Sequence, residues 1–264
     1  MLISSTQQKL LSMDSIQIIP ITELPIIEKG GNIAELICNA AEKQKTPIQN
    51  DDIVIVTHVI VSRAEGSTID LNTIESSEFA KTIAKKSDKD PAAVEVVLRE
   101  AESIIRMRNG SLITLTKHGF ICANSGVDKS NVPGERTVAL LPKDPDKSAR
   151  QIRQEIKKQT GKTVAVIISD THGRPLRDGE INIAIGVAGL TPLRDRRGEK
   201  DLFDYVLKIK RTAIADELAS AAELAIGQAD EAIPAAIIRG YPYQKSETAT
   251  AKDMLRPLEK EFFL

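Results

Sequence analysis

The chain has 264 residues, 41% hydrophobic and 28% charged, which is the length and balance of a folded globular protein with a substantial buried core. Its 36 basic and 37 acidic residues give a net charge of -1, which argues against nucleic acid as the main partner. Aromatic residues make up only 3%, without tryptophan, and no apolar run approaches the roughly 20 residues that span a membrane.

The ends and the cysteines indicate a reducing location. Residues 1–15 lack the charged start and apolar block of a signal peptide, so we expect a flexible leader and a cytoplasmic protein. Cys38 and Cys122 lie in a predicted helix and a predicted buried strand, which is typical of inert core thiols.

The first third of the chain alternates strands and helices. Pro20 ends the first apolar run, and Asn32 with Glu35 forms a capping-box-like helix start. The β-branched run from Ile53 to Val56 has polar flanks, which is typical of a strand buried on both faces. In order, we predict a strand at 16–19, a loop at 23–26, a helix from 33 that ends before Pro47, a strand at 53–56 and an irregular exit segment at 57–66.

The middle of the chain is predicted to contain two helices followed by a hairpin. The helices cover 77–86 and 91–107, the second with Asp90 as its N-cap. The hairpin strands, 112–116 and 120–123, flank a turn that exposes His118, and a polar loop starts at Asn124.

The last part repeats the alternation. Gly161 and Gly227 each follow a helical pattern and predict helix ends. We expect a helix at 148–160, a strand at 163–169 that leads into a polar turn at 170–174, strands at 182–188 and, more weakly, at 204–209, a helix at 213–226, a strand at 235–238 and a charged, helical tail at 243–264.

Together these elements predict a mixed α/β fold. Neither the G-x-G-x-x-G fingerprint of Rossmann folds nor the G-x-x-x-x-G-K-[ST] motif of P-loop proteins occurs, so a nucleotide would need a different scaffold. No repeat or linker divides the chain, and we treat 16–242 as one functional unit.

Two segments place a carboxylate on a polar turn after an apolar strand: Asn124 to Asn131 and Ser169 to Arg174. Hard divalent cations prefer oxygen ligands, and one or two carboxylates plus substrate phosphates are a common arrangement. Asp128 and Asp170, with the Thr171 hydroxyl, could form such a site. The alternative is that each aspartate only ties its own turn through an Asx-type hydrogen bond, which is the commoner use of a single turn aspartate.

Other residues could hold phosphate. The polar loop from Gly227 to Pro234 and the guanidinium groups of Arg63 and Arg174 are candidates, although an ordinary turn and solvated charges would look the same in sequence. His58 and His172 could bind phosphate or substrate, or simply pack in turns. No zinc-ligand spacing and no G-x-S-x-G elbow occurs, so no catalytic nucleophile is assigned.

Five motifs then occur in order between Ile16 and Tyr241, and their co-linear series resembles the coenzyme F420-0:L-glutamate ligase (coenzyme F420:gamma-glutamyl ligase) family. The motifs are Leu24-Pro25-Ile26, Val61-Ser-Arg-Ala-Glu-Gly66, Asn124-Ser-Gly-Val-Asp-Lys-Ser-Asn131, Ser169-Asp-Thr-His-Gly-Arg174, and Ile233-Pro234 followed by Ile238-Arg-Gly240.

The resemblance implies a GTP-dependent homodimeric enzyme that adds L-glutamate to coenzyme F420-0, with two divalent cations (Mg²⁺ or Mn²⁺), K⁺, and two intertwined subdomains with mixed sheets. It assigns the first metal to Asp128 and Asp170, and the second to Thr171 and Gln228. It assigns GTP contacts to Glu23, Leu24, Pro25, Ile26, His58, Arg63, Asn131, Gly227, Gln228, Ala229, Asp230, Glu231, Ala232, Ile233 and Pro234.

Three positions depart from the family pattern. Arg63 stands where lysine is usual, Ser125 where alanine is expected, and Ala232 where glycine is common. Two other functions remain open: a metal-dependent GTP hydrolase or nucleotidyltransferase, and a non-catalytic GTP-binding protein. Phosphate release that depends on glutamate would separate the ligase from both.

Overall fold

A computed structural model of the chain describes residues 15–108 and 110–260, and its main body is a five-stranded mixed sheet. The strand order is β1 (Gln17–Pro20), β12 (Ala235–Arg239), β2 (Ile53–Thr57), β8 (Ala165–Arg174) and β9 (Arg177–Ala188). Only β2 and β8 pair in parallel, and the other neighbours are antiparallel. The predicted mixed α/β fold is confirmed.

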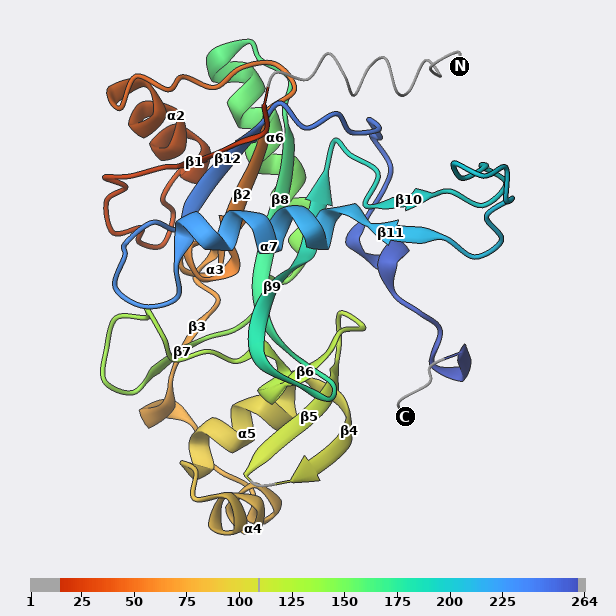
Figure 1. Cartoon of the computed structure of the whole chain (residues 1–264). Helices are drawn as coiled ribbons and strands as arrows, with labels where there is room; N and C mark the ends of the chain where they lie inside the picture. The colour runs from red at the N-terminus through yellow and green to blue at the C-terminus, as the bar shows by residue number, and fades with distance from the viewer. Residues whose placement is uncertain (1–14, 109, 261–264) are drawn as a thin grey trace.

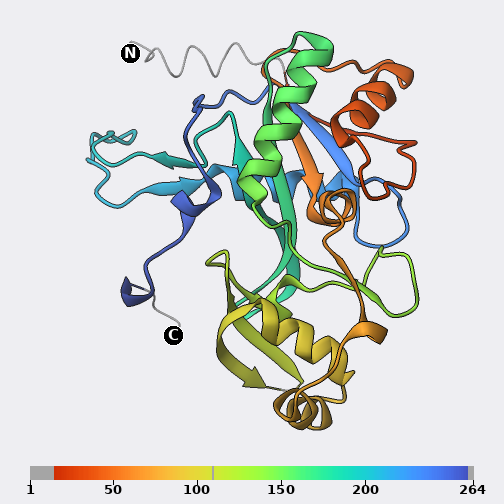
Figure 2. The same cartoon turned by 180° about the vertical axis from the view of Figure 1, so that it is seen from behind.

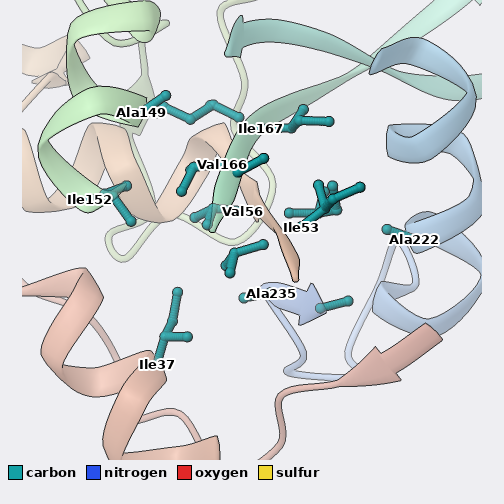
Figure 3. Packing of buried hydrophobic residues seen from close by; sticks show 14 of the residues in the cluster. Ile37, Ile53, Val56, Ala149, Ile152, Val166, Ile167, Ala222 and Ala235 are labelled. Atoms are coloured by element: carbon teal, nitrogen blue, oxygen red, sulfur yellow. The ribbon is translucent and has the colours of Figure 1, made fainter. Parts of the chain in front are cut away.

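Helices cover both faces of this sheet. α7 (Ile214–Ile226) crosses one face, whereas α6 (Pro145–Thr160) and α2 (Ile33–Lys43) lie on the other, as the two opposite views show (Figures 1 and 2). Residues 53–56 of β2 are completely buried because apolar side chains meet them from both layers. Figure 3 shows Ile37 and Ile152 approaching the sheet from the helices of one layer and Ala222 from α7.

A smaller lobe is inserted into the chain between α3 (His58–Glu65) and α6. The chain enters it through β3 (Thr68–Asp70) and returns through β7 (Thr137–Ala139), which pair antiparallel. The lobe contains η1 (Leu71–Thr73), α4 (Glu78–Ser87), α5 (Pro91–Glu100), the antiparallel sheet β4 (Ala101–Arg108), β5 (Ser111–Thr116) and β6 (Ile121–Ala123), and η2 (Asn124–Gly126). It has apolar clusters of its own, and Figure 1 shows it below the main sheet.

The remaining elements lie at the edge of the main body. β10 (Leu193–Asp195) and β11 (Arg211–Ala213) form a two-stranded ribbon that projects from it in both views (Figures 1 and 2). The last elements of the described residues are two short 3₁₀ turns, η3 (Ala251–Met254) and η4 (Leu258–Lys260). In the part of the chain described here, no helix is both long and apolar enough to cross a bilayer.

Several predicted elements are wrong. Residues 57–66 are mostly helical, because burial of Ile60 and Val61 outweighs the low helix propensity of β-branched residues. The helix predicted to reach residue 107 ends at Glu100, where the chain turns extended and pairs as β4 with β5. No strand forms over 204–209, apart from an isolated bridge at Val206.

The polar segment 170–174 is also not a turn. It continues β8, paired with β9, and the chain reverses only after Arg174. The tail forms short 3₁₀ turns rather than a continuous helix, and His118 is half-buried, with its Nε2 3.0 Å from the Pro142 carbonyl oxygen. The leader at 1–14 and residues 261–264 lie outside the described residues.

Candidate active site

A cavity of about 520 Å³ lies beside the carboxyl end of β2 and the middle of β8, where the parallel pairing of the two strands ends. Crevices at this end of parallel strands are frequent ligand sites. All four residues predicted as metal ligands line it, namely Asp128, Asp170, Thr171 and Gln228. The predicted GTP contacts that also line it are Leu24, Pro25, Ile26, His58, Arg63, Asn131, Gly227, Ala229, Glu231, Ala232, Ile233 and Pro234.

Two predicted GTP contacts are not among the lining residues. The Glu23 side chain is exposed and pairs with Lys43 on α2, and Asp230 lies at the exposed tip of the loop that follows α7. Arg174 is also absent from the lining, because its guanidinium donates to the Asp178 carbonyl oxygen at 2.8 Å within the β8–β9 hairpin.

Asp128 reaches the cavity from the last part of the small lobe, between η2 and β7. Its backbone pairs with Ala139 through N–O distances of 3.0 and 2.7 Å. Its carboxylate accepts hydrogen bonds from the Ser130 amide at 2.7 Å and the Ser130 hydroxyl at 2.6 Å. The Asx-type bond considered from the sequence is therefore present, and it holds the carboxylate at the cavity wall.

Asp170 is a buried carboxylate fixed by two histidines. His58 Nε2 lies 3.1 Å from its Oδ1 and His172 Nε2 lies 3.0 Å from its Oδ2, while the Thr171 amide donates to Oδ1 at 2.8 Å. Burial alone would raise the pKa of this carboxyl, but the charge of His58 and the hydrogen bonds from both histidines hold it well below its usual range.

The pKa of His58 is raised, whereas that of Asp170 is lowered. Burial opposes its protonation, but the Asp170 and Asp128 carboxylates outweigh that effect and raise the pKa. Because opposite charges stabilise each other in a poorly solvated site, this end of the cavity is built to keep Asp170 ionised.

Three buried polar atoms in the cavity wall lack a hydrogen-bond partner among the described residues. They are His58 Nδ1, Arg63 Nη2 and Ser169 Oγ. Most buried polar groups in proteins are hydrogen-bonded, so unpaired donors around a cavity indicate a polar ligand. The other terminal nitrogen of Arg63 donates to the Asn131 carbonyl oxygen at 3.3 Å, which holds the guanidinium against the wall.

The loop at 227–234 forms the opposite wall and joins α7 to β12. Gly227 has φ 77° and ψ -177°, a conformation that only glycine adopts readily. Ala232, which stands where the family commonly has glycine, has φ 56° and is therefore held in the left-handed region. The Pro234 carbonyl oxygen accepts from the Thr57 amide at 3.0 Å, so the loop is anchored at the end of β2.

The residues suit hard divalent cations. They offer two carboxylates, the Thr171 hydroxyl and the Gln228 amide oxygen, with Thr171 Oγ1 and Gln228 Oε1 only 3.1 Å apart. Over residues 15–108 and 110–260, no three or more His, Cys, Asp or Glu side chains form a metal-binding cluster. A cation here would therefore depend on additional oxygens, and phosphate oxygens of a bound nucleotide are the usual source.

Sequence reasoning missed three contributors: Ser130, Asn182 and Glu223. The first ties down Asp128, and the other two hydrogen-bond to Thr171 or Gln228. No sequence signal points to these three, because each acts through a contact between residues that only the fold brings together.

Comparisons with known proteins identify the family of the chain. Residues 22–240 match the sequence model of the F420-0:Gamma-glutamyl ligase family. The coenzyme F420:L-glutamate ligase of Methanothermobacter thermautotrophicus is 45% identical over 94% of this chain and 98% of its own length. Enzymes of the same name from Methanocaldococcus jannaschii and Methanopyrus kandleri are 48% and 49% identical, over 91% and 81% of this chain and 94% and 82% of their own lengths. The chain therefore belongs to the F420-0:gamma-glutamyl ligase family.

Proposed function

We propose that this chain is the enzyme of coenzyme F420 biosynthesis that uses GTP to join L-glutamate to coenzyme F420-0. The relatives that carry the name of that ligase align with this chain over almost their full lengths. The observation that supports it most strongly is that Asp128 and Asp170, 42 positions apart in sequence, line one cavity together with Arg63 and the 227–234 loop.

GTP is the expected energy source. Its phosphates would lie between the Asp128–Asp170 end of the cavity and Arg63, whose unpaired nitrogen can donate to a phosphate oxygen. The apolar side chains at 24–26 and the loop at 227–234 would hold the nucleoside. K⁺ is expected as an additional activator.

Asp128 and Asp170 would hold one divalent cation, and Thr171 with Gln228 a second. Bound there, the cations supply charge neutralisation for the triphosphate and for the phosphoryl group in transfer. The role of this chain is to keep Asp170 ionised through its histidines, to orient Asp128 through Ser130, and to align the triphosphate with the acceptor. Neither aspartate is a nucleophile in this scheme.

The reaction we propose has two steps. In the first, the lactyl carboxylate of F420-0 attacks the γ-phosphorus and the bond to the β–γ bridging oxygen breaks. GDP is released, and the carboxylate becomes an acyl phosphate. In the second, the glutamate amine attacks the acyl carbon, the phosphate leaves with the bonding electrons, and a proton passes from nitrogen to solvent. A further round would use the side-chain carboxylate of the glutamate already added.

Mass spectrometry of F420-0 incubated with the protein, GTP, Mn²⁺, K⁺ and L-glutamate tests this directly. We expect a mass increase of one or more glutamyl residues and phosphate release that depends on glutamate. The Asp128→Asn variant should lose turnover and keep the wild-type circular dichroism spectrum. Phosphate release without glutamate would instead show a hydrolase, and GTP binding without any product would show a non-catalytic binding protein.

We also propose that the enzyme works as a homodimer. The tip of the β10–β11 ribbon exposes Leu202, Phe203, Tyr205, Val206 and Ile209, an apolar set that a second copy of the chain could cover. Light scattering should give twice the chain mass, and Phe203→Asp combined with Ile209→Asp should shift the protein to monomers. A wild-type monomer at micromolar concentration would refute the proposal.

A further inference from the structure

Glu223 lies next to the cavity and contacts Gln228, one of the two residues proposed for the second cation. It lies in the last turn of α7, and one of its carboxylate oxygens, Oε2, accepts a hydrogen bond from the backbone N–H of Asn182 at 2.8 Å. Its other oxygen, Oε1, accepts from Gln228 Nε2. One carboxylate thus joins the middle of β9 to the loop at 227–234.

This contact sets the orientation of the Gln228 amide. An ionised carboxylate can only accept hydrogen bonds, so it selects the nitrogen end of the Gln228 side chain. The oxygen end must then point the other way, where it accepts from the Thr171 hydroxyl at 3.1 Å. Asn182 Oδ1 is a second acceptor for that hydroxyl, at 3.2 Å.

The result is a pair of adjacent oxygens that keep lone pairs for a further contact, because Gln228 Oε1 has two and the Thr171 proton can use only one of them. Since the Thr171 proton is directed to Asn182 or Gln228, the hydroxyl lone pairs are available at the cavity wall. Reversing the Gln228 amide would place an N–H group there, and N–H groups repel cations. Such outer contacts to metal ligands tune metal affinity strongly.

We infer that Glu223 is a positioning residue, which fixes the amide oxygen of Gln228 beside Thr171 and so creates the second cation site. This inference rests on the proposed function, because it assumes that the pair binds a divalent cation. It also explains a carboxylate at the end of a helix where the helix dipole disfavours one.

The Glu223→Gln variant tests the inference with almost no change in side-chain volume. In glutamine an NH₂ group replaces one of the two carboxylate oxygens. Either the backbone N–H of Asn182 or Gln228 Nε2 would then face a donor instead of an acceptor in its present orientation. The matched control is Glu217→Gln on the same helix, because Glu217 is exposed. Glu223→Asp keeps the charge with a shorter reach and provides a second variant if Glu223→Gln does not fold.

Electron paramagnetic resonance titration with Mn²⁺ is done with a saturating non-hydrolysable GTP analogue, whose phosphates supply the further oxygens that the second cation needs. It measures the free ion and requires no turnover, and a titration without protein corrects for Mn²⁺ that the analogue binds by itself. We expect the weaker class of Mn²⁺ sites to lose about 10- to 100-fold in affinity in Glu223→Gln, as outer-contact losses generally cause. Glu223→Asp should fall between that variant and the wild type, and the Glu217→Gln control should match the wild type. Thermal unfolding should separate this loss from a purely structural defect.

A double-mutant cycle with Gln228→Ala shows whether Glu223 acts through Gln228. If it does, Glu223→Gln should weaken Mn²⁺ binding no further once Gln228 has been truncated. Unchanged Mn²⁺ affinity in Glu223→Gln, or fully additive losses, would overturn the inference. If the wild type binds neither Mn²⁺ nor GTP, the proposed function itself fails, which is a different result.

Discussion

Gly227 offers a sharp test of whether the 227–234 loop binds GTP in the conformation seen here. Its φ of 77° and ψ of -177° lie in a region that is essentially restricted to glycine. A Cβ added there would also lie 2.2–2.5 Å from the carboxylate group of Glu231. That side chain is exposed and can move, but it would give up its 2.8 Å hydrogen bond from the Ala229 amide.

The expected magnitude follows mainly from the backbone. Holding alanine in this conformation costs about 1–3 kcal/mol, whereas the exposed hydrogen bond adds little. Gly227→Ala should therefore shift the loop towards other conformations, and ligand affinity falls with the fraction that remains competent to bind. A bias of that size corresponds to about 5- to 150-fold weaker GTP binding.

Titration with a fluorescent GTP analogue measures this change, and Gly161→Ala is the matched control. Gly161 also follows a helix with positive φ, at 69°, but nothing lies within 4 Å of its Cβ position, and it does not line the cavity. The control should lose about 1 kcal/mol of stability and bind nucleotide normally. GTP affinity in Gly227→Ala equal to that of the control would refute the assignment of this loop.

Three further predictions concern stability and reactivity. Arg239→Ala should lower the free energy of unfolding, measured by urea denaturation, by about 3 kcal/mol. The substitution leaves the buried Asp52 carboxylate without the two hydrogen bonds of 2.8 Å that Arg239 donates, and a loss below about 1 kcal/mol would contradict this. Burial raises the pKa of Asp146, so this carboxyl loses its proton at a higher pH in the folded state than in the unfolded chain. The free energy of unfolding therefore falls as the pH rises from the unfolded pKa to the folded one. The stability of Asp146→Asn relative to wild type should therefore increase across that window, and a pH-independent difference would contradict the prediction. Burial raises the pKa of Cys38 to about 11 and of Cys122 to about 12, so a thiol reagent at pH 8 should label both in urea and neither in the native protein.

Local sequence determined the elements whose signals are local. The caps at Asn32, Asp90 and Gly161 mark helix ends correctly, because a cap needs only its own neighbouring backbone amides or a left-handed residue. The buried run at 53–56 forms the central strand for a similar reason, since a continuous apolar segment of this length can bury the side chains of both its faces only inside the sheet.

Elements that depend on distant partners could not be predicted in this way. The 101–108 segment continues a helical pattern in sequence, yet it is a strand because β5 offers it a hydrogen-bonding partner. Arg239 shows the same limit for motifs: the sequence places it in a family segment, but only the fold reveals that it pairs with Asp52 rather than lining the cavity.

The site divides along the same line. From the sequence alone we predicted a cation site, because oxygen-bearing side chains on two polar segments are the ligands that hard cations need. Only the tertiary structure decided that Asp128, from the end of the inserted lobe, and Asp170, from the main sheet, share one cavity. It also shows that two histidines contact Asp170 and that Glu223 accepts a hydrogen bond from Gln228. These contacts join separate elements, and such contacts arise when the core packs, so no pattern of neighbouring residues encodes them.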